Sequence, residues 1–171
     1  MKPSAIDLSQ ELLRTYNDPV MPNIRRADYV EAMVAAFLRP AGWSRNSSWD
    51  SWDFQHDDSG LRMELKQSAA RQTSGRSSSP ARFDIAPRTG YWDGSEWHDV
   101  PGRHADIYVF AWHPEAEPSA DQRDPSSWLF YVVPESKLPE QQKTIGLPGI
   151  RSRADPCRLH RLAHHLKPPT T

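Results

Sequence analysis

The stretch from Trp52 to Lys66 constrains the fold more than any other part of this 171-residue chain. Its apolar residues recur at every second position on both sides of residues 57–60, Asp-Asp-Ser-Gly, a sequence typical of a tight turn. Alternation with a period of two around a turn predicts a β-hairpin. With residues 57–60 as the loop, Phe54 lies opposite Met63.

The same register places Asp53 directly opposite Glu64, with Lys66 on the same face of the hairpin. Opposed Cβ atoms in a sheet lie about 4.5–5.5 Å apart, and like charges at that distance weaken the pairing. A divalent cation with oxygen ligands would offset the repulsion. The alternative is a solvated polar face on which Lys66 and Arg62 neutralise the two acids.

The chain contains its own control for this spacing. Glu135-Ser136-Lys137 repeats the Glu-x-Lys pattern, but it lies between Pro134 and Pro139 and has no acidic partner strand. We interpret it as fortuitous, so the aspartate opposite Glu64 is what distinguishes the hairpin.

Asp53, followed eleven positions later by Glu64-x-Lys66 on an apolar strand, resembles the PD-(D/E)xK nuclease superfamily over roughly residues 24–113. The resemblance implies an α/β (α+β) chain with a mixed central β-sheet flanked by helices, the restriction-endonuclease-like core. It also implies that Asp53, Glu64 and the backbone carbonyl of Leu65 bind Mg²⁺, for which Mn²⁺ can substitute. Lys66 would then position or deprotonate the attacking water.

Two helices are expected before the hairpin, over residues 4–16 and 23–38, the second with Asn23 as its N-cap. Glu31 falls inside the apolar stripe of the second helix, where a carboxylate is costly unless it is paired or bound to a metal. In the resembled family a glutamate on this helix often points at the active site. A Glu at the edge of the stripe that pairs with a surface Arg is the alternative.

The resembled family usually has a separate strand before the strand that bears the aspartate. Between Gly42 and Trp49 there is little room for a strand and a turn, so we expect one long bent strand to do both jobs. The family usually also has a helix after the lysine strand, which here could begin only at residues 69–72. Gln67, next to the lysine, is a candidate for a substrate contact.

Three further strands are expected, over residues 83–86, 107–112 and 128–133, and a basic helix over residues 157–166. Residues 107–112 are apolar on both faces and predict a central strand. Residues 87–102 are expected to form a long loop that Trp92 and Trp97 pin to the body of the protein. The alternative is that exposed aromatics beside Arg88 and Arg103 stack on bases or sugars. His104 and Asp106 enter the central strand, where they extend the site or support the strand end.

The net charge of −1 does not indicate a nucleic-acid binder, but the charge is unevenly distributed. Residues 61–90 hold six Arg or Lys against two acids, and residues 137–171 hold seven against two. Local basic patches matter more for phosphate binding than the average charge does. Candidate contacts to the phosphate backbone are Arg71, Arg76, Arg82 and Arg88, with a plain linker or ordinary surface charge as the alternative.

We therefore expect one nuclease-like domain over residues 1–171, with a core at about 24–133, an N-terminal helix and a basic tail at 137–171. The single cysteine, Cys157, excludes an internal disulfide, and no run is apolar enough for a signal core or a membrane span, so a cytoplasmic protein is expected.

The expected activity is Mg²⁺-dependent cleavage of DNA, with RNA as an open possibility. Double-strand cleavage would need a homodimer or two successive nicks. The alternatives are a non-catalytic nucleic-acid-binding module on the same fold and a structural or interaction domain.

Overall fold

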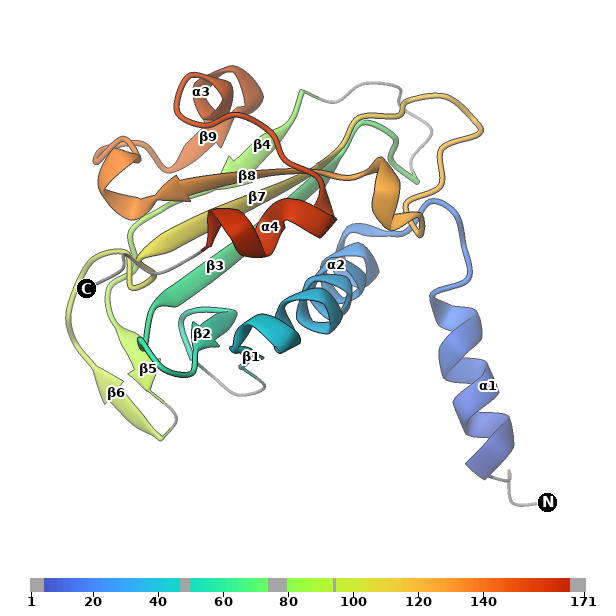
Figure 1. Ribbon diagram of the computed structural model, residues 1–171, viewed down its shortest axis with the longest axis horizontal. Coiled ribbons are helices and arrows are strands. Elements are labelled where there is room, and N and C mark those ends of the chain that lie inside the picture. Colours follow the sequence, from blue (N-terminus) through green and yellow to red (C-terminus); the bar gives the residue numbers. More distant parts are fainter. Residues whose placement is uncertain (1–4, 47–49, 74–79, 94, 167–171) are drawn as a thin grey trace.

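The computed structural model describes residues 5–46, 50–73, 80–93 and 95–166 of the chain. These form an α+β fold in which a mixed five-stranded sheet is accompanied by helices and two small antiparallel pairs of strands (Figure 1). The helices are α1 (Ala5–Thr15), α2 (Asn23–Leu38), α3 (Leu147–Arg151) and α4 (Leu159–His165), with 3-10 turns at Arg39–Ala41, Pro125–Ser127 and Glu135–Lys137. The strands are β1 (Trp43–Arg45), β2 (Phe54–His56), β3 (Arg62–Ala69), β4 (Arg82–Asp84), β5 (Tyr91–Asp93), β6 (Glu96–His98), β7 (Ile107–His113), β8 (Leu129–Pro134) and β9 (Thr144–Gly146).

The five-stranded sheet has the order β1-β2-β3-β7-β8. Its β1, β2 and β3 form an antiparallel meander, β3 pairs in parallel with β7, and β8 is antiparallel to β7. The parallel pairing runs from Met63 opposite Ile107 to Ala69 opposite His113, and it is the longest register in the sheet. The predicted strand at residues 107–112 is thus confirmed as an interior strand, flanked on both sides.

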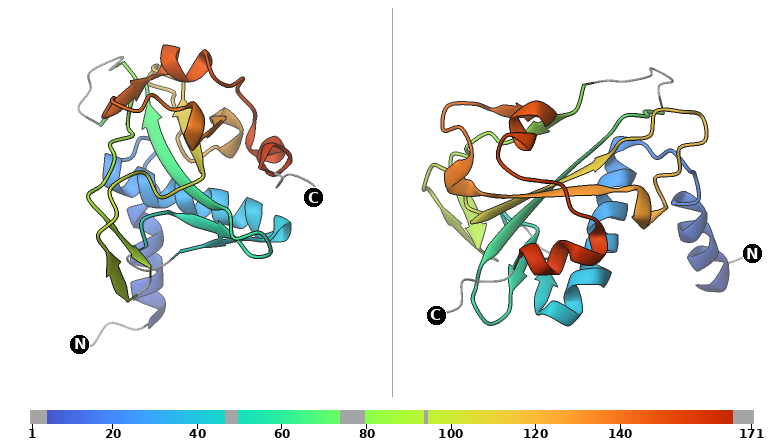
Figure 2. Two further views of the ribbon diagram at one scale, coloured as in Figure 1. Left: turned by 90° about the vertical axis from the view of Figure 1, so that its left-hand side faces the viewer. Right: turned by 45° about the horizontal axis from the view of Figure 1, so that its top comes forward.

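Two hydrophobic cores lie on opposite faces of the sheet. On one face, α2 and α4 pack through Val34 and Leu162 onto Met63, Leu65 and neighbouring buried residues of the sheet. The other face packs Phe110 and Tyr131 against Phe83 of β4 and Ile145 of β9. Figure 2 shows the helices and the β4–β9 pair arranged around the sheet in this way. The strict alternation of β3 therefore directs Glu64 and Lys66 toward the β4 side and away from α2.

Helix α2 is fixed to the sheet by a buried charge as well as by its apolar stripe. Arg26 is 1% exposed, and its guanidinium donates to the side chains of Gln67, Gln72 and Asn23. Asn23 is therefore occupied inside the first turn of the helix, and Pro22 is the N-cap residue. The prediction that Asn23 caps the helix was wrong because its side chain serves the Arg26 network instead.

The predicted β2–β3 hairpin is confirmed, with Phe54 paired to Met63. The turn closes through a hydrogen bond from the amide of Gly60 to the carbonyl of His56, 2.9 Å long. Gly60 adopts a φ of 70°, a left-handed conformation that glycine tolerates and most side chains do not.

The expectation of one long bent strand before the aspartate was wrong. A separate strand, β1, pairs with β2 through Trp43 opposite His56, so the strand before the aspartate and the strand after it are distinct. Three residues suffice for β1 because Gly42, at a φ of 77°, turns the chain directly out of the preceding helical turn.

The expectation of a long loop at residues 87–102 was also wrong. Strands β5 and β6 form a small hairpin there, which projects from the body of the molecule (Figures 1 and 2).

Strand β4 begins one residue earlier than predicted and pairs with β9 outside the main sheet. Between β3 and β7, the described residues 70–73, 80–93 and 95–106 contain no helix, which differs from the usual pattern of the resembled family.

Helix α1 confirms the expected N-terminal helix and lies apart from the sheet (Figure 1). Its side chains Leu8, Leu12 and Leu13 are all more than half exposed. Within the described residues, no helix combines the length and apolar character that crossing a membrane requires.

We expect Arg26→Ala to lower the free energy of unfolding by about 2–4 kcal/mol, because the truncation empties a buried site and leaves the half-buried Gln67 Oε1 without its hydrogen-bond donor. Urea denaturation measures this change directly. Arg25→Ala is the matched control, since the neighbouring Arg25 is exposed and its loss should cost no more than about 0.5 kcal/mol. Equal effects of the two substitutions would contradict a structural role for the buried guanidinium.

Candidate metal-binding and catalytic site

Asp53 lies directly before β2 and binds the neighbouring strand on both sides of Glu64. Its backbone amide donates to the carbonyl of Met63 at 3.0 Å, and its Oδ2 accepts a hydrogen bond from the amide of Leu65 at 2.7 Å. The carboxylate thus takes the place of a backbone acceptor in the β2–β3 ladder. Because residues 63 and 65 are both tied to Asp53, the Asp53 and Glu64 carboxylates are held close together.

Glu64 and Lys66 project from the same face of β3, as their spacing predicts, and their side chains form an ion pair. Both are largely shielded, with 15% of the Glu64 side chain and 23% of the Lys66 side chain exposed. Arg62 does not join them, since its guanidinium lies over the ring of Trp52, 4.1 Å from the centroid. One lysine therefore faces two carboxylates. We call Asp53, Glu64 and Lys66 the carboxylate site.

Glu31 approaches this site from α2 but has a partner of its own. Its Oε2 lies 2.6 Å from a guanidinium nitrogen of Arg45 on β1, and 24% of its side chain is exposed. This is the pairing with an arginine at the edge of the stripe that was the alternative for Glu31. Its charge is nevertheless near enough to act on Asp53.

The protonation of Asp53 reflects this crowding. Burial and, after it, the negative charges of Glu64 and Glu31 together raise the pKa of Asp53 to about 7. The hydrogen bond from the Leu65 amide and the charge of Lys66 act in the opposite direction without overcoming it. A carboxylate in such surroundings gains from a nearby positive charge that neither Lys66 nor Arg45 fully supplies.

Two adjoining spaces meet at Glu64. A cleft of about 380 Å³ is lined by Asp53, Glu64, Arg88 and Trp97, among others. A small cavity of about 20 Å³ lies behind it, where Glu64 and Lys66 meet Asp84, His104 and Tyr108. The small cavity is polar and has room for about one water molecule.

Three residues around the small cavity, Asp84, Tyr108 and Arg103, were missed in the sequence analysis. Burial alone would raise the pKa of Asp84, but the Ala86 amide and the Arg88 guanidinium together lower it. Burial and the charge of Glu64 raise the pKa of Tyr108. Tyr108 is the parallel-strand neighbour of Glu64, so it could have been found only by knowing that β3 pairs with β7.

The other predicted contacts are scattered. Gln67 faces α2, where its amide hydrogen-bonds Asn23 and Arg26, so it lies on the opposite side of β3 from the carboxylate site. Arg71 donates to the carbonyl of Ala116. Arg88 lines both spaces beside Glu64 and pairs with Asp84 at 2.8 Å. Arg82 is exposed at the start of β4, and Arg76 lies outside the described residues.

Of the two residues that enter β7, Asp106 supports the end of the strand and His104 lies beside the site. Asp106 supports the sheet, since its Oδ2 accepts from the amide of Arg62 at 2.8 Å. His104 lines the small cavity, where its ring packs against Tyr91. Burial and the charge of Arg62 lower the pKa of His104, which favours its neutral form. Its Nε2 is buried and has no hydrogen-bond partner among the described residues.

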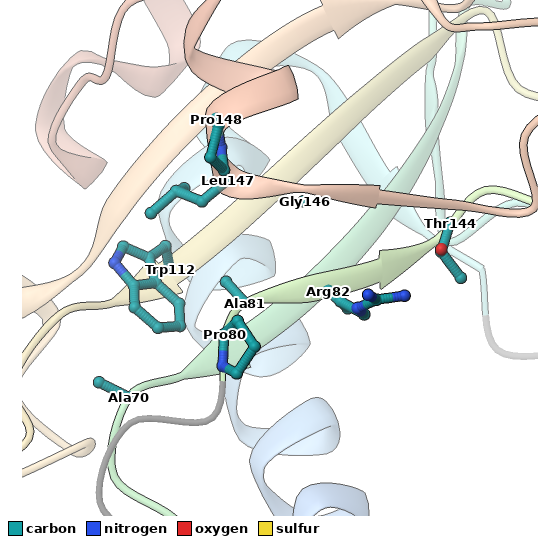
Figure 3. Close-up of a pocket in the computed structure, with 9 residues that line it drawn as sticks. All are labelled: Ala70, Pro80, Ala81, Arg82, Trp112, Thr144, Gly146, Leu147 and Pro148. Atoms are coloured by element: carbon teal, nitrogen blue, oxygen red, sulfur yellow. The ribbon is translucent and has the colours of Figure 1, made fainter.

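A larger pocket of about 680 Å³ lies elsewhere, between Trp112, Leu147 and Pro148 (Figure 3). Arg82 points along one side of it. The described residues that line this pocket include no carboxylate, histidine or cysteine, so they offer a metal ion no side-chain ligand of those types. Unlike this pocket, the cleft and the small cavity beside Glu64 are both lined by carboxylates.

A second set of metal-ligand types converges on the β5–β6 hairpin. Donor atoms of Asp93, Glu96 and His98 all lie within 4.8 Å of one another, and Asp93 lies 2.8 Å from His98. The two acids are exposed, and Asp93 already pairs with His98. Nothing in the sequence pattern had indicated it, because residues 87–102 were expected to form a loop.

Comparison with models of known protein families, with curated proteins and with solved structures found no match for this chain. The interpretation of the carboxylate site therefore depends on its own residues and geometry.

The raised pKa of Asp53 predicts how stability depends on pH. Between the ordinary value of 3.8 and about 7, the folded state holds a proton that the unfolded state has lost, so the free energy of unfolding falls as the pH rises through this window. Asp53→Asn keeps an oxygen for the Leu65 amide and removes the charge. Without divalent cations, this variant should exceed wild type at pH 8 by on the order of 3 kcal/mol and match it near pH 4.

Urea denaturation at a series of pH values checks this prediction. Asp58→Asn is the control, because Asp58 is an exposed carboxylate on the turn of the same hairpin and its loss should change little. An Asp53→Asn variant that is less stable than wild type at pH 8 would show that the Asp53 charge is well compensated in the fold.

Proposed function

We propose that this protein is a metal-dependent nuclease that hydrolyses the phosphodiester bonds of DNA at the carboxylate site. The observation that supports this most strongly is the geometry of Asp53, which holds its carboxylate beside Glu64 at the cost of a pKa near 7. Two adjacent acids repel each other, and a cation bound between them would offset that repulsion.

The residues present fit a Mg²⁺ or Mn²⁺ ion. Asp53 and Glu64 offer hard carboxylate oxygens from adjacent strands, and the cleft beside them gives an ion and a phosphate access from solvent. The resemblance to the PD-(D/E)xK superfamily adds the backbone carbonyl of Leu65 as a third ligand. When bound, the ion would supply Lewis-acid stabilisation of the charge that develops on the phosphate and on the leaving oxygen.

We propose that Lys66 positions or deprotonates the water that attacks the phosphodiester bond. Its ammonium is anchored on Glu64, and the small cavity that it lines has room for one water molecule. The water oxygen would attack the phosphorus and displace the leaving oxygen. Lys66 would orient the water through its ammonium, or accept the water's proton after first losing one of its own. Glu31 lies outside the carboxylate site. Its charge acts on Asp53, and its ion pair with Arg45 links α2 to β1.

The order of elements supports the same proposal. A helix, α2, is followed by the separate strand β1, then by the aspartate before β2 and by Glu64 and Lys66 on β3. This is the order that the resemblance implies, including the separate strand that the sequence alone seemed to leave no room for. A restriction-endonuclease-like core is thus part of the proposal, and a homodimer or two successive nicks would allow double-strand cleavage.

One observation favours the structural alternative. Lys66 already neutralises Glu64, and Arg45 neutralises Glu31, so the acids are partly satisfied within the chain. Neither carboxylate of the site is turned out into solvent, however, which is what a merely solvated polar face would show. The two functions differ in whether the site takes up a divalent cation.

Plasmid cleavage tests the proposed activity. Purified protein should nick or cut DNA with Mg²⁺ or Mn²⁺ but not with EDTA, and Lys66→Ala should lower the rate by about 100-fold or more, the range of a lost general base. Lys137→Ala is the matched control, because it changes the exposed lysine of the second Glu-x-Lys sequence. Unchanged cleavage by Lys66→Ala would remove Lys66 from the reaction.

Metal binding is tested separately by calorimetric titration with Mg²⁺ or Mn²⁺. Wild type should bind the ion, whereas Asp53→Ala should lose at least about tenfold in affinity because a charged ligand is gone. Asp58→Asn should bind as wild type does. Absence of binding by wild type, together with no cleavage of plasmid, single-stranded DNA or RNA, would favour the structural alternative.

A further inference from the structure

The β5–β6 hairpin presents two tryptophans to solvent. Trp92 and Trp97 are register partners, their ring centroids lie 5.7 Å apart, and 38% and 45% of their surfaces are exposed. The prediction that both pin the segment to the body was therefore wrong. Tyr91 does that instead, because it faces inward while its neighbour Trp92 faces out.

The inner face of the hairpin is firmly attached near the carboxylate site. Tyr91 stacks on His98 with centroids 4.8 Å apart and packs on His104 at 4.4 Å. It also meets Trp52, the residue directly before Asp53, at 6.1 Å. The tryptophans on the outer face are thus held at a fixed place relative to Asp53.

Trp97 forms part of the cleft that contains Asp53 and Glu64. Its ring lies against the bare backbone of Gly90, where an added Cβ would come within 2.4 Å of Trp97 Cζ2. Glycine at position 90 therefore allows the indole to lie where it does.

These groups match the parts of a nucleotide. An indole face takes a nucleobase by stacking, and the cation of Arg88, in the same cleft, takes a phosphate. The cleft volume of about 380 Å³ is of the size of small-ligand sites. In a duplex, both faces of each base are covered by its neighbours, so a base must be unpaired or extruded to reach Trp97.

We propose that this cleft binds one unpaired nucleotide of a DNA single strand, with the base stacked on Trp97 and its phosphate directed toward Arg88 and the carboxylate site. The proposal rests on the proposed function for the place of the phosphate, and it names the substrate class as single-stranded DNA. Stacking on Trp97 itself requires no cleavage.

The test is fluorescence anisotropy with a labelled oligodeoxythymidylate, in the Lys66→Ala background so that hydrolysis does not interfere. Trp97→Ala should weaken binding by about fivefold to a hundredfold, the range that loss of one base–aromatic stack spans. Trp97→Phe should restore most of the affinity. Trp92→Ala should change it little, because Trp92 shares the hairpin but is not among the residues lining the cleft.

The same protein should bind the single strand more tightly than a duplex containing it, and Trp97→Ala should remove that preference. Equal binding by Trp97→Ala and its parent, or tighter binding of the duplex, would overturn the proposal. Tighter binding of the corresponding RNA would overturn the assignment to DNA.

Failure of the proposed function is distinguishable from failure of this inference. Trp97-dependent binding of single strands by a protein that cleaves nothing would leave the inference standing and remove the nuclease. Lys66-dependent cleavage with the same rate and strand preference in Trp97→Ala would do the reverse.

Discussion

The parallel pairing of β3 with β7 is the constraint on which the rest of the structure depends. It runs over seven residue pairs and makes β7 an interior strand, covered on both faces. One face of β7 carries Val109 toward α2 and α4, and the other carries Phe110 toward β4 and β9. Both hydrophobic cores include residues of β7, and β3 adds Met63 and Leu65 to the first. The same register sets Glu64 beside Tyr108 and so forms the wall of the small cavity.

Against that rigid pair, Asp53 makes the single contact that turns a polar strand face into a candidate site. Its carboxylate substitutes for a backbone acceptor of β2 and receives the Leu65 amide. The hydrogen bond fixes the side chain in a buried place beside Glu64, where its negative charge is disfavoured. A local arrangement that costs stability and survives in a well-packed sheet is typical of a functional site.

The sequence predicted the parts of the structure that short-range patterns encode. Period-two alternation around residues 57–60 gave the hairpin and its register, and with it the opposition of Asp53 and Glu64. The continuous apolar run at residues 107–112 gave the interior strand. The elements that the sequence analysis missed are those whose pairing partners lie far away along the chain. Strand β1 has one buried residue, Trp43, and exists because β2 lies beside it, while β4 pairs with β9 some sixty residues later.

The buried Arg26 is a further case, because nothing in the spacing of α2 distinguishes it from the exposed Arg25. Its burial follows from the amides of Gln67 and Asn23, which come to it from β3 and from its own first turn. The exposed Trp92 and Trp97 were assigned an anchoring role because aromatics in glycine-rich segments usually pack inward. The alternation of a hairpin hidden in that segment gave the anchoring role to Tyr91.

The hydrogen bond between Asp53 and Leu65 has a consequence for the choice of ion. Because Oδ2 already accepts the amide, a bidentate grip by Asp53 would have to compete with that bond, and Oδ1 is the oxygen that an ion meets first. Ca²⁺ takes six to eight oxygens and often chelates both oxygens of one carboxylate, whereas Mg²⁺ takes six at near-octahedral angles and keeps several waters. If the carboxylate site binds an ion as proposed, an aspartate that offers one free oxygen would favour the smaller, octahedral cation.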